Sequence, residues 1–327
     1  MPALPQFLNL DGIPSKRPRA DTAVHFWRDS LNGWRASKGD RTEEIWSHCR
    51  EINFELRRRI MDGVDYERTL PSIPLLIVSG GLSSECPLTR KDFEKLIGHV
   101  VDVSTRNRFL YLYDCERLLS SVQECTVEIV QTLGEFYRTF NAPSLTGGPP
   151  LQRDGVVFSR SALVTQLFAD MSFIFIRLHS LLDYSVKLAV EAQNLQTDFT
   201  IYPCMSSRGK LYGHRRLVSF NGAVGTLFED CSFLRLLKTL RNHIIHDGLL
   251  DEKPKVYESY SDGSVVERFI LFPDMTEGRL DHYVNRNLFY GREDKINLRL
   301  PAIIWEFQTR LIATLERVRE ELVAGFV

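Results

Sequence analysis

Residues 159–194, SRSALVTQLFADMSFIFIRLHSLLDYSVKLAVEAQN, decide the fold that the sequence predicts. Apolar residues occupy most of this stretch, which predicts a central helix that is buried on several sides. Its densest apolar run, residues 173–176, lies between Asp170 and Arg177. No run in the chain approaches the length of about 18 apolar residues that a membrane-spanning helix needs. We therefore expect no membrane span and no membrane partner.

Three further helices are predicted by the periodic spacing of apolar residues along residues 106–141, 222–247 and 300–324. Gly248 fits the position that follows a helix end, and Pro301 fits the first turn of the last helix. Between these two helices, apolar residues on both sides of Asp262 and Gly263 predict a small β-hairpin.

The first 100 residues predict shorter and more varied elements. Residues 21–61 have a helical pattern, residues 71–81 form an apolar run typical of a strand, and Thr89 is placed to cap a helix. The sequence therefore predicts a mainly α fold, with a helical bundle over residues 101–327. A small β-hairpin is inserted before the last helix, and residues 1–100 form a mixed, mostly helical N-terminal extension.

The composition excludes several classes of function. A formal net charge of -1 excludes a protein that coats nucleic acid by bulk charge, so any nucleic-acid site must be local. The six cysteines are scattered and contain no C-x-x-C pair, so we expect a reducing, cytoplasmic environment without a disulfide framework. The chain has no phosphate-binding glycine loop and no metal-ligand constellation, and we expect no metal and no cofactor.

Residues 240–248, LRNHIIHDG, lie at the end of a strongly periodic helix. At about 100° per residue, one side of this helix is apolar and the other polar. The apolar line consists of Phe233, Leu237, Leu240 and Ile244, and the polar side consists of Arg235, Lys238, Asn242 and His246. Arg241 lies about 140° round from His246, so the two do not share a face. A flexed arginine stem, or a second copy of the helix, would have to bring them together.

The spacing between Arg241 and His246 is weak evidence when taken alone. An arginine followed by four to six residues and a histidine occurs four times in the chain, and about two such matches are expected by chance. Only Arg241 has an asparagine directly after it and a place late in a periodic helix. The other two Arg-Asn pairs begin at Arg106 and Arg286, and they have Tyr111 and Gly291 in place of the histidine.

With these restrictions, the stretch resembles the R-[polar]-x-x-x-H motif of the HEPN superfamily (higher eukaryotes and prokaryotes nucleotide-binding domain). The resemblance implies a HEPN-like bundle that acts as a homodimer, with both motifs facing one cleft. It also implies a metal-independent endoribonuclease in defence or a toxin–antitoxin pair, with RNA and a cognate antitoxin or regulatory protein as partners. Arg241 and His246 would take the catalytic positions and Asn242 the polar position.

The chemistry of RNA cleavage suits these residue types. RNA carries its own nucleophile, the 2′-OH, beside the scissile phosphate. Cleavage then needs a proton acceptor near neutral pH, which histidine supplies, and a cation on the phosphate, which arginine supplies. A structural role is also open, because arginine and histidine in the last turn complement the helix dipole without any catalysis. For His243, we expect a partly buried structural role.

A second basic segment, SSRGKLYGHRR at residues 206–216, precedes the motif helix. Basic residues around an aromatic ring can hold a single strand by phosphate contacts and base stacking, although a plain solvated loop is equally compatible. The candidate RNA-binding residues are Arg208, Lys210, Tyr212, His214, Arg215, Arg216 and, on the motif helix, Lys238. Two alternative functions stay open: a non-catalytic HEPN-like bundle that binds nucleotide, RNA or a partner protein, and a structural helical adaptor.

Overall fold

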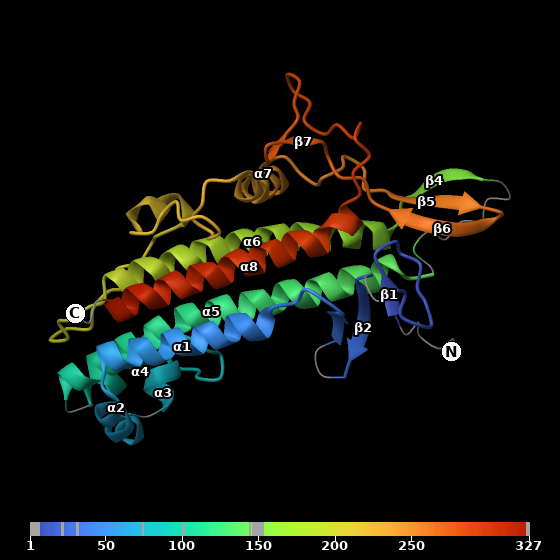
Figure 1. Ribbon diagram of the computed structural model, residues 1–327. Helices are drawn as coiled ribbons and strands as arrows, with labels where there is room; N and C mark the ends of the chain where they lie inside the picture. The colour runs from blue at the N-terminus through green and yellow to red at the C-terminus, as the bar shows by residue number, and fades with distance from the viewer. Residues whose placement is uncertain are drawn as a thin grey trace. The chain divides into compact units, whose positions relative to one another are not determined.

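Figure 1 shows the computed structural model, which describes residues 7–20, 23–30, 33–73, 75–99, 102–143, 145 and 154–324. The chain forms two units, and each is assembled from three separate segments. Unit 1 contains Met1–Thr42, Glu124–Leu181 and Val224–Arg310, and unit 2 contains Glu43–Gln123, Leu182–Ala223 and Leu311–Val327. Neither unit is bounded at residue 100, so the two-domain division made from the sequence stays a prediction.

The prediction of a mainly α bundle with one hairpin is wrong. Among the described residues, 54% are helical and 13% are in strands. Eight short strands form three small antiparallel sheets, ordered β1-β2-β3, β4-β5-β6 and β7-β8, which makes the fold mixed α/β. The predicted long helices are present as α5 (Val103–Phe140), α6 (Ala162–Gln193) and α8 (Ile296–Ala324), and each divides its residues between the two units.

The first sheet replaces part of a predicted helix. Phe26 is 1% exposed, its neighbours Trp27 and Arg28 are exposed, and Trp34 is buried. Aromatic residues favour strands, and the helical pattern assigned to residues 21–61 holds only from Thr42 onward. The strands are β1 (Phe7–Asn9), β2 (His25–Asp29) and β3 (Gly33–Ala36), and the helix is α1 (Thr42–Ile60).

The second sheet contains the predicted hairpin and one unexpected strand (Figure 1). β5 (Val256–Ser261) and β6 (Ser264–Phe269) flank Asp262 and Gly263, whose φ angles of 49° and 71° fit a two-residue hairpin turn. The hairpin prediction is therefore confirmed. β4 (Gly155–Ser159) pairs with the outer side of β5, which adds a strand from about 100 residues earlier in the chain.

A buried ion pair joins this sheet to two other segments of unit 1. Arg268 on β6 donates from Nε to Glu258 Oε1 at 2.7 Å, and both side chains are buried. Its Nη1 lies within hydrogen-bond distance of three backbone oxygens, those of Ala142 at 2.9 Å, Phe140 at 3.2 Å and Gly12 at 3.4 Å. Burial of an unpaired charge is costly, so these partners fix where the three segments meet.

The start of α8 depends on a residue of α5. Pro301 lies in the second turn of α8, not in the first turn as predicted, because the helix begins at Ile296. Proline has no N–H, so the carbonyl of Asn297 lacks its helical donor. The hydroxyl of Tyr137, a buried residue of α5, donates to this carbonyl instead. The side chain of Asn297 also bonds the backbone of Ile270 at 3.0 Å and of Leu10 at 2.7 Å.

Unit 2 is helical in its described residues. Along α1, Ile45, Cys49, Ile52 and Leu56 are buried at helical spacing and form its core-facing stripe. Thr89 caps α4 as predicted, since its side chain accepts the N–H of Asp92 at 3.2 Å. The shorter helices are α2 (Gly63–Thr69), η1 (Leu70–Ser72), α3 (Leu75–Ser79), α4 (Arg90–Gly98) and η2 (Tyr212–Leu217).

Helix α3 differs from what the sequence predicted, and helix α6 bears on the expected absence of a membrane span. Residues 75–79 form α3, so the strand predicted along residues 71–81 is wrong; a short apolar run fits a helix equally well. α6 is long and apolar enough to cross a membrane by length and composition, with 44% of its most apolar window buried. A core helix of a soluble protein meets the same test, and the structure is compatible with a soluble chain.

We predict that Arg268→Met destabilises unit 1 by about 3–5 kcal/mol, because it leaves Glu258 buried without its cation. The urea midpoint of unfolding measures this loss. Arg138→Ala is the matched control, since Arg138 pairs with Glu135 on the surface of the same unit and such pairs contribute about 0–1 kcal/mol. Equal midpoint shifts for the two variants would contradict the role given to Arg268.

Candidate functional site

The stretch LRNHIIHDG lies at the C-terminal end of α7 (Ser232–His246) in unit 1. α7 begins ten residues later than predicted, but its two faces are as expected. Of the predicted apolar line, Leu237 and Leu240 are fully buried and Phe233 and Ile244 are half-buried. The residues of the predicted polar side are half-buried or exposed. Gly248 adopts a φ of 115° and donates its N–H to the carbonyl of His243 at 3.0 Å, which confirms the predicted cap.

The three candidate catalytic residues are only partly brought together. Arg241 is half-buried and donates from Nη1 to Asn242 Oδ1 at 3.1 Å. His246 is exposed at the last position of α7, and within the described residues its imidazole has no hydrogen bond or ion pair. A single chain thus joins Arg241 to Asn242 and leaves His246 accessible without a bond to either.

The Arg241–Asn242 hydrogen bond is not specific to the motif. Arg106 Nη2 donates to Asn107 Oδ1 at 3.0 Å, although that pair has Tyr111 in place of the histidine. Arg106 is further held by the carbonyl of Ile97 at 2.7 Å, which gives it a structural role. The distinctive feature at α7 is therefore the exposed histidine, and not the arginine–asparagine contact.

His243 is held on both ring nitrogens, in agreement with the structural role expected for it. It is 5% exposed, and its Nδ1 lies 3.4 Å from Asn287 Nδ2 and 3.5 Å from Asp247 Oδ2. Its Nε2 lies 3.4 Å from the carbonyl oxygen of Leu249. If Nδ1 accepts from Asn287, Nε2 carries the proton that faces Leu249, which accounts for both nitrogens.

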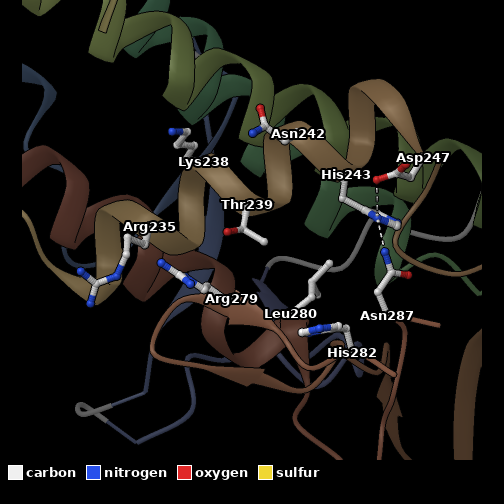
Figure 2. Close-up of a pocket in the computed structure, with 10 residues that line it drawn as sticks. All are labelled: Arg235, Lys238, Thr239, Asn242, His243, Asp247, Arg279, Leu280, His282 and Asn287. Carbon is white, nitrogen blue, oxygen red and sulfur yellow. Dashed lines mark hydrogen bonds and ion pairs between the residues drawn. The ribbon is translucent and has the colours of Figure 1, made fainter. Parts of the chain in front are cut away.

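A groove of about 500 Å³ runs along the polar face of α7, and we refer to it as the α7 groove. One wall is α7 itself, and the other is the segment that contains β7 (Met275–Thr276) and β8 (Arg279–Leu280). Figure 2 shows the His243 ring between Asp247 and Asn287 at one end of the groove. The lining residues are Arg235, Lys238, Thr239, Asn242, His243, Asp247, Arg279, Leu280, His282 and Asn287.

Gly278 sets the position of the second wall. Its φ is 79°, and a Cβ at this position would lie 2.1 Å from the carbonyl oxygen of Ser232 on α7. The hairpin backbone can approach α7 this closely only because the residue has no side chain. Two hydrogen bonds complete the contact: Thr239 Oγ1 donates to the Gly278 carbonyl at 2.9 Å, and Arg235 Nε donates to the Glu277 carbonyl at 3.2 Å.

The α7 groove is cationic. Its lining residues include three cationic side chains, Arg235, Lys238 and Arg279, and a single carboxylate, that of Asp247. Arg235 already pairs with Asp230 at 3.1 Å, whereas Lys238 and Arg279 are exposed and have no ionic partner among the described residues. Unpaired cations on two walls of one groove favour an anionic ligand that has several negative charges.

The second set of candidate RNA-binding residues lies in unit 2, so it belongs to a different unit from the motif. Arg208, His214 and Arg216 are exposed, and Lys210 and Arg215 are half-buried. The segment is tied to α6 by the backbone N–H of Tyr212, which donates to Asp183 Oδ1 at 2.7 Å.

Tyr212 itself has no open face for a base. Its side chain is 7% exposed, and the guanidinium of Arg215 lies 4.7 Å from the centre of its ring. The aromatic part of the predicted RNA-binding segment is therefore corrected: Tyr212 packs inside unit 2, and only the basic residues remain accessible. The sequence around Tyr212 does not distinguish a ring that stacks on bases from a ring that packs inside the protein.

The second wall of the α7 groove was not predicted from the sequence. Arg279, His282 and Asn287 line it, and Asn287 belongs to one of the Arg-Asn pairs that lacked a histidine. The Glu277-Gly278 dipeptide is the one available signal, because it fits a two-residue hairpin turn. In the described part of the chain, no group of three histidine, cysteine, aspartate or glutamate residues is placed to hold a metal ion.

Comparison of the chain with protein-family models, with curated proteins and with solved structures finds no match. The resemblance of residues 241–246 to the HEPN motif thus rests on the residues themselves.

We predict that Gly278→Ala separates the hairpin from α7, because the new Cβ would overlap the Ser232 carbonyl. Faster hydrogen exchange of the backbone amides in β7 and β8 measures this separation. Gly225→Ala is the matched control: Gly225 has the same φ of 79° in the same unit, but nothing lies within 4 Å of its Cβ position. This control should lose only the stability that an alanine in the left-handed conformation costs, about 1–2 kcal/mol. Indistinguishable exchange in the two variants would contradict the close approach.

Proposed function

We propose that the protein is a metal-independent endoribonuclease that cleaves RNA with Arg241, Asn242 and His246 at a cleft between two copies of the chain. The observation that supports this proposal is the exposed imidazole of His246, which has no bond to any described residue, at the end of a helix whose polar face lines a cationic groove. A histidine free of internal partners can exchange protons with a substrate.

In this mechanism the 2′-hydroxyl of one nucleotide attacks the adjacent phosphorus while a His246 imidazole accepts its proton. The bond from phosphorus to the 5′-oxygen breaks, a 2′,3′-cyclic phosphate forms, and the imidazolium returns the proton to the departing 5′-oxygen. One copy of α7 supplies this histidine, and the other copy supplies Arg241. Arg241 donates to the non-bridging oxygens as their charge increases, and Asn242 orients its guanidinium.

Two copies are required because a single chain does not complete the site. Arg241 is directed to Asn242, and it shares no hydrogen bond with His246 in the described residues. A homodimer that places two α7 ends against each other supplies an arginine and a histidine from different copies. We further propose that the enzyme acts in the cytoplasm as a toxin or defence effector, controlled by a cognate antitoxin or regulatory protein.

A second candidate function has a specific observation in its favour. The α7 groove is complete within one chain, whereas the Arg241–His246 pair is not. A HEPN-like protein that binds RNA or nucleotide without cleaving it would need the groove alone. Binding with no turnover in the following experiment would support this function over the nuclease.

We predict that His246→Ala and Arg241→Ala each reduce cleavage of a broad RNA panel, assayed in chelator, by about 100-fold or more. Loss of the proton acceptor or of the phosphate cation removes an interaction that strengthens in the transition state. His99→Ala and Arg50→Ala are the controls, because both residues are exposed and lie in unit 2. Equal cleavage by all five proteins, or no cleavage by any, would overturn the proposal.

Mixing the two inactive variants tests whether the site lies between copies. A mixed dimer of Arg241→Ala and His246→Ala retains one arginine and one histidine, each from a different chain. If the residues act across copies, activity should rise above that of either variant alone, limited by the roughly half of dimers that are mixed. An unchanged rate would place the arginine and the histidine of each reaction in the same chain.

A further inference from the structure

The α7 groove is bordered by a tight turn that has an exposed aromatic ring. His282 and Asn287 both line the groove, and the turn of residues 283–286 lies between them in the chain. Tyr283 donates its N–H to the Arg286 carbonyl at 2.7 Å, and Arg286 returns a hydrogen bond at 2.9 Å. These bonds fix the backbone of the turn, while the side chain of Tyr283 is 71% exposed.

The turn is strained and has no packing role among the described residues. Val284 adopts a φ of 52°, in the left-handed region that β-branched residues rarely enter. Its side chain is 77% exposed, so burial of the valine does not offset the strain. Backbone strain of about 1–3 kcal/mol per residue is concentrated at ligand-binding and active sites. This outlier indicates that the turn presents its side chains to a ligand.

Two cations line the α7 groove, and the exposed ring of Tyr283 directly follows the lining residue His282 in the chain. Lys238 comes from α7, Arg279 from β8 and Tyr283 from the turn, and neither cation has an ionic partner in the described residues. Proteins that bind single-stranded nucleic acid combine such cations on the backbone phosphates with aromatic rings on which bases stack. Duplex RNA offers no unstacked base to a tyrosine, so the surface favours a single strand.

We propose that the α7 groove and the Tyr283 turn bind one single strand of RNA, with Lys238 and Arg279 on neighbouring phosphates and Tyr283 stacked on an adjacent base. The choice of RNA over other anions rests on the proposed nuclease function. The groove and the turn form a binding path that would hold the strand beyond the cleavage residues. Asn242 connects this binding path to the cleavage residues, because it lines the groove and accepts the hydrogen bond from Arg241. A strand in the groove is therefore led to the arginine that contacts the scissile phosphate.

The phosphate contacts are tested by the salt dependence of binding. The probe is a labelled 2′-O-methyl RNA strand, which cannot be cleaved by 2′-OH attack, so the wild-type chain can be used. The logarithm of the binding constant should fall with the logarithm of salt concentration, by about 0.7 for each neutralised phosphate of a single strand. Lys238→Ala with Arg279→Ala should reduce this slope by about 1.4.

The control for this pair is Arg17→Ala with Lys38→Ala, which removes one arginine and one lysine from exposed positions of the same unit that do not line the groove. The control should leave the slope at its wild-type value. A groove variant with the slope of the wild type, or of the control, would overturn the proposal.

The stacking contact is tested independently, because tyrosine carries no charge near neutral pH. Tyr283→Ala should weaken binding of the same strand about 5- to 150-fold with no change in the salt slope, and Tyr283→Trp should restore binding. Phe54→Ala is the control, since Phe54 is an exposed aromatic residue on α1 of unit 2. Equal affinities for the wild type and Tyr283→Ala would remove the tyrosine from the site.

The remaining outcomes separate this proposal from the nuclease proposal. If duplex RNA binds as tightly as the single strand, or an acidic peptide competes equally at matched charge, the single-strand assignment fails. If the groove and turn variants lose binding but no protein cleaves RNA, the binding path holds and the nuclease fails. If His246→Ala abolishes cleavage while the groove variants bind normally, the nuclease holds and this path fails.

Discussion

The arrangement of unit 1 depends on a charge that has been moved out of water. The guanidinium of Arg268 is buried, and it is tolerated there because its Nε donates to Glu258 and its Nη1 contacts three backbone carbonyls. Tyr260 donates to the second oxygen of Glu258 at 3.0 Å, so the carboxylate is satisfied as well. One side chain thereby specifies where the N-terminal segment, the end of α5 and the β4-β5-β6 sheet meet, with little freedom for other packings.

The α7 groove shows how short elements can position a site. α7 supplies one wall through its amphipathic spacing, and a hairpin with two-residue strands supplies the other. The hairpin is too short to be stable by itself, and its position follows from Gly278 and two hydrogen bonds to α7. The cations of the groove therefore come from chain positions about 40 residues apart, and their distance is set by a glycine that has no chemistry of its own.

The sequence predicted those features whose causes are local. The helical spacing of α5, α6 and α8, the Asp262-Gly263 turn and the Gly248 cap are each determined within a few residues. β4 and the second wall of the groove were not predictable, because their pairing partners are distant in the chain. The strands at residues 25–29 and 33–36 were missed because the helical pattern that begins at Thr42 was extended toward the N-terminus. Tyr212 was misjudged because burial depends on tertiary packing.

Pro301 makes the first turns of α8 depend on a residue that is distant in the chain. The Asn297 carbonyl has no donor within its own helix, and its partner, the Tyr137 hydroxyl, is 160 positions away. The beginning of α8 is therefore incomplete as an isolated peptide and becomes fully bonded only when α5 is in place. During synthesis, the bond between Tyr137 and Asn297 can form only after residues 296–301 have been made, so this contact of unit 1 is non-local. A chaperone that shields α5 in this interval would act on a step that brings together residues 160 positions apart.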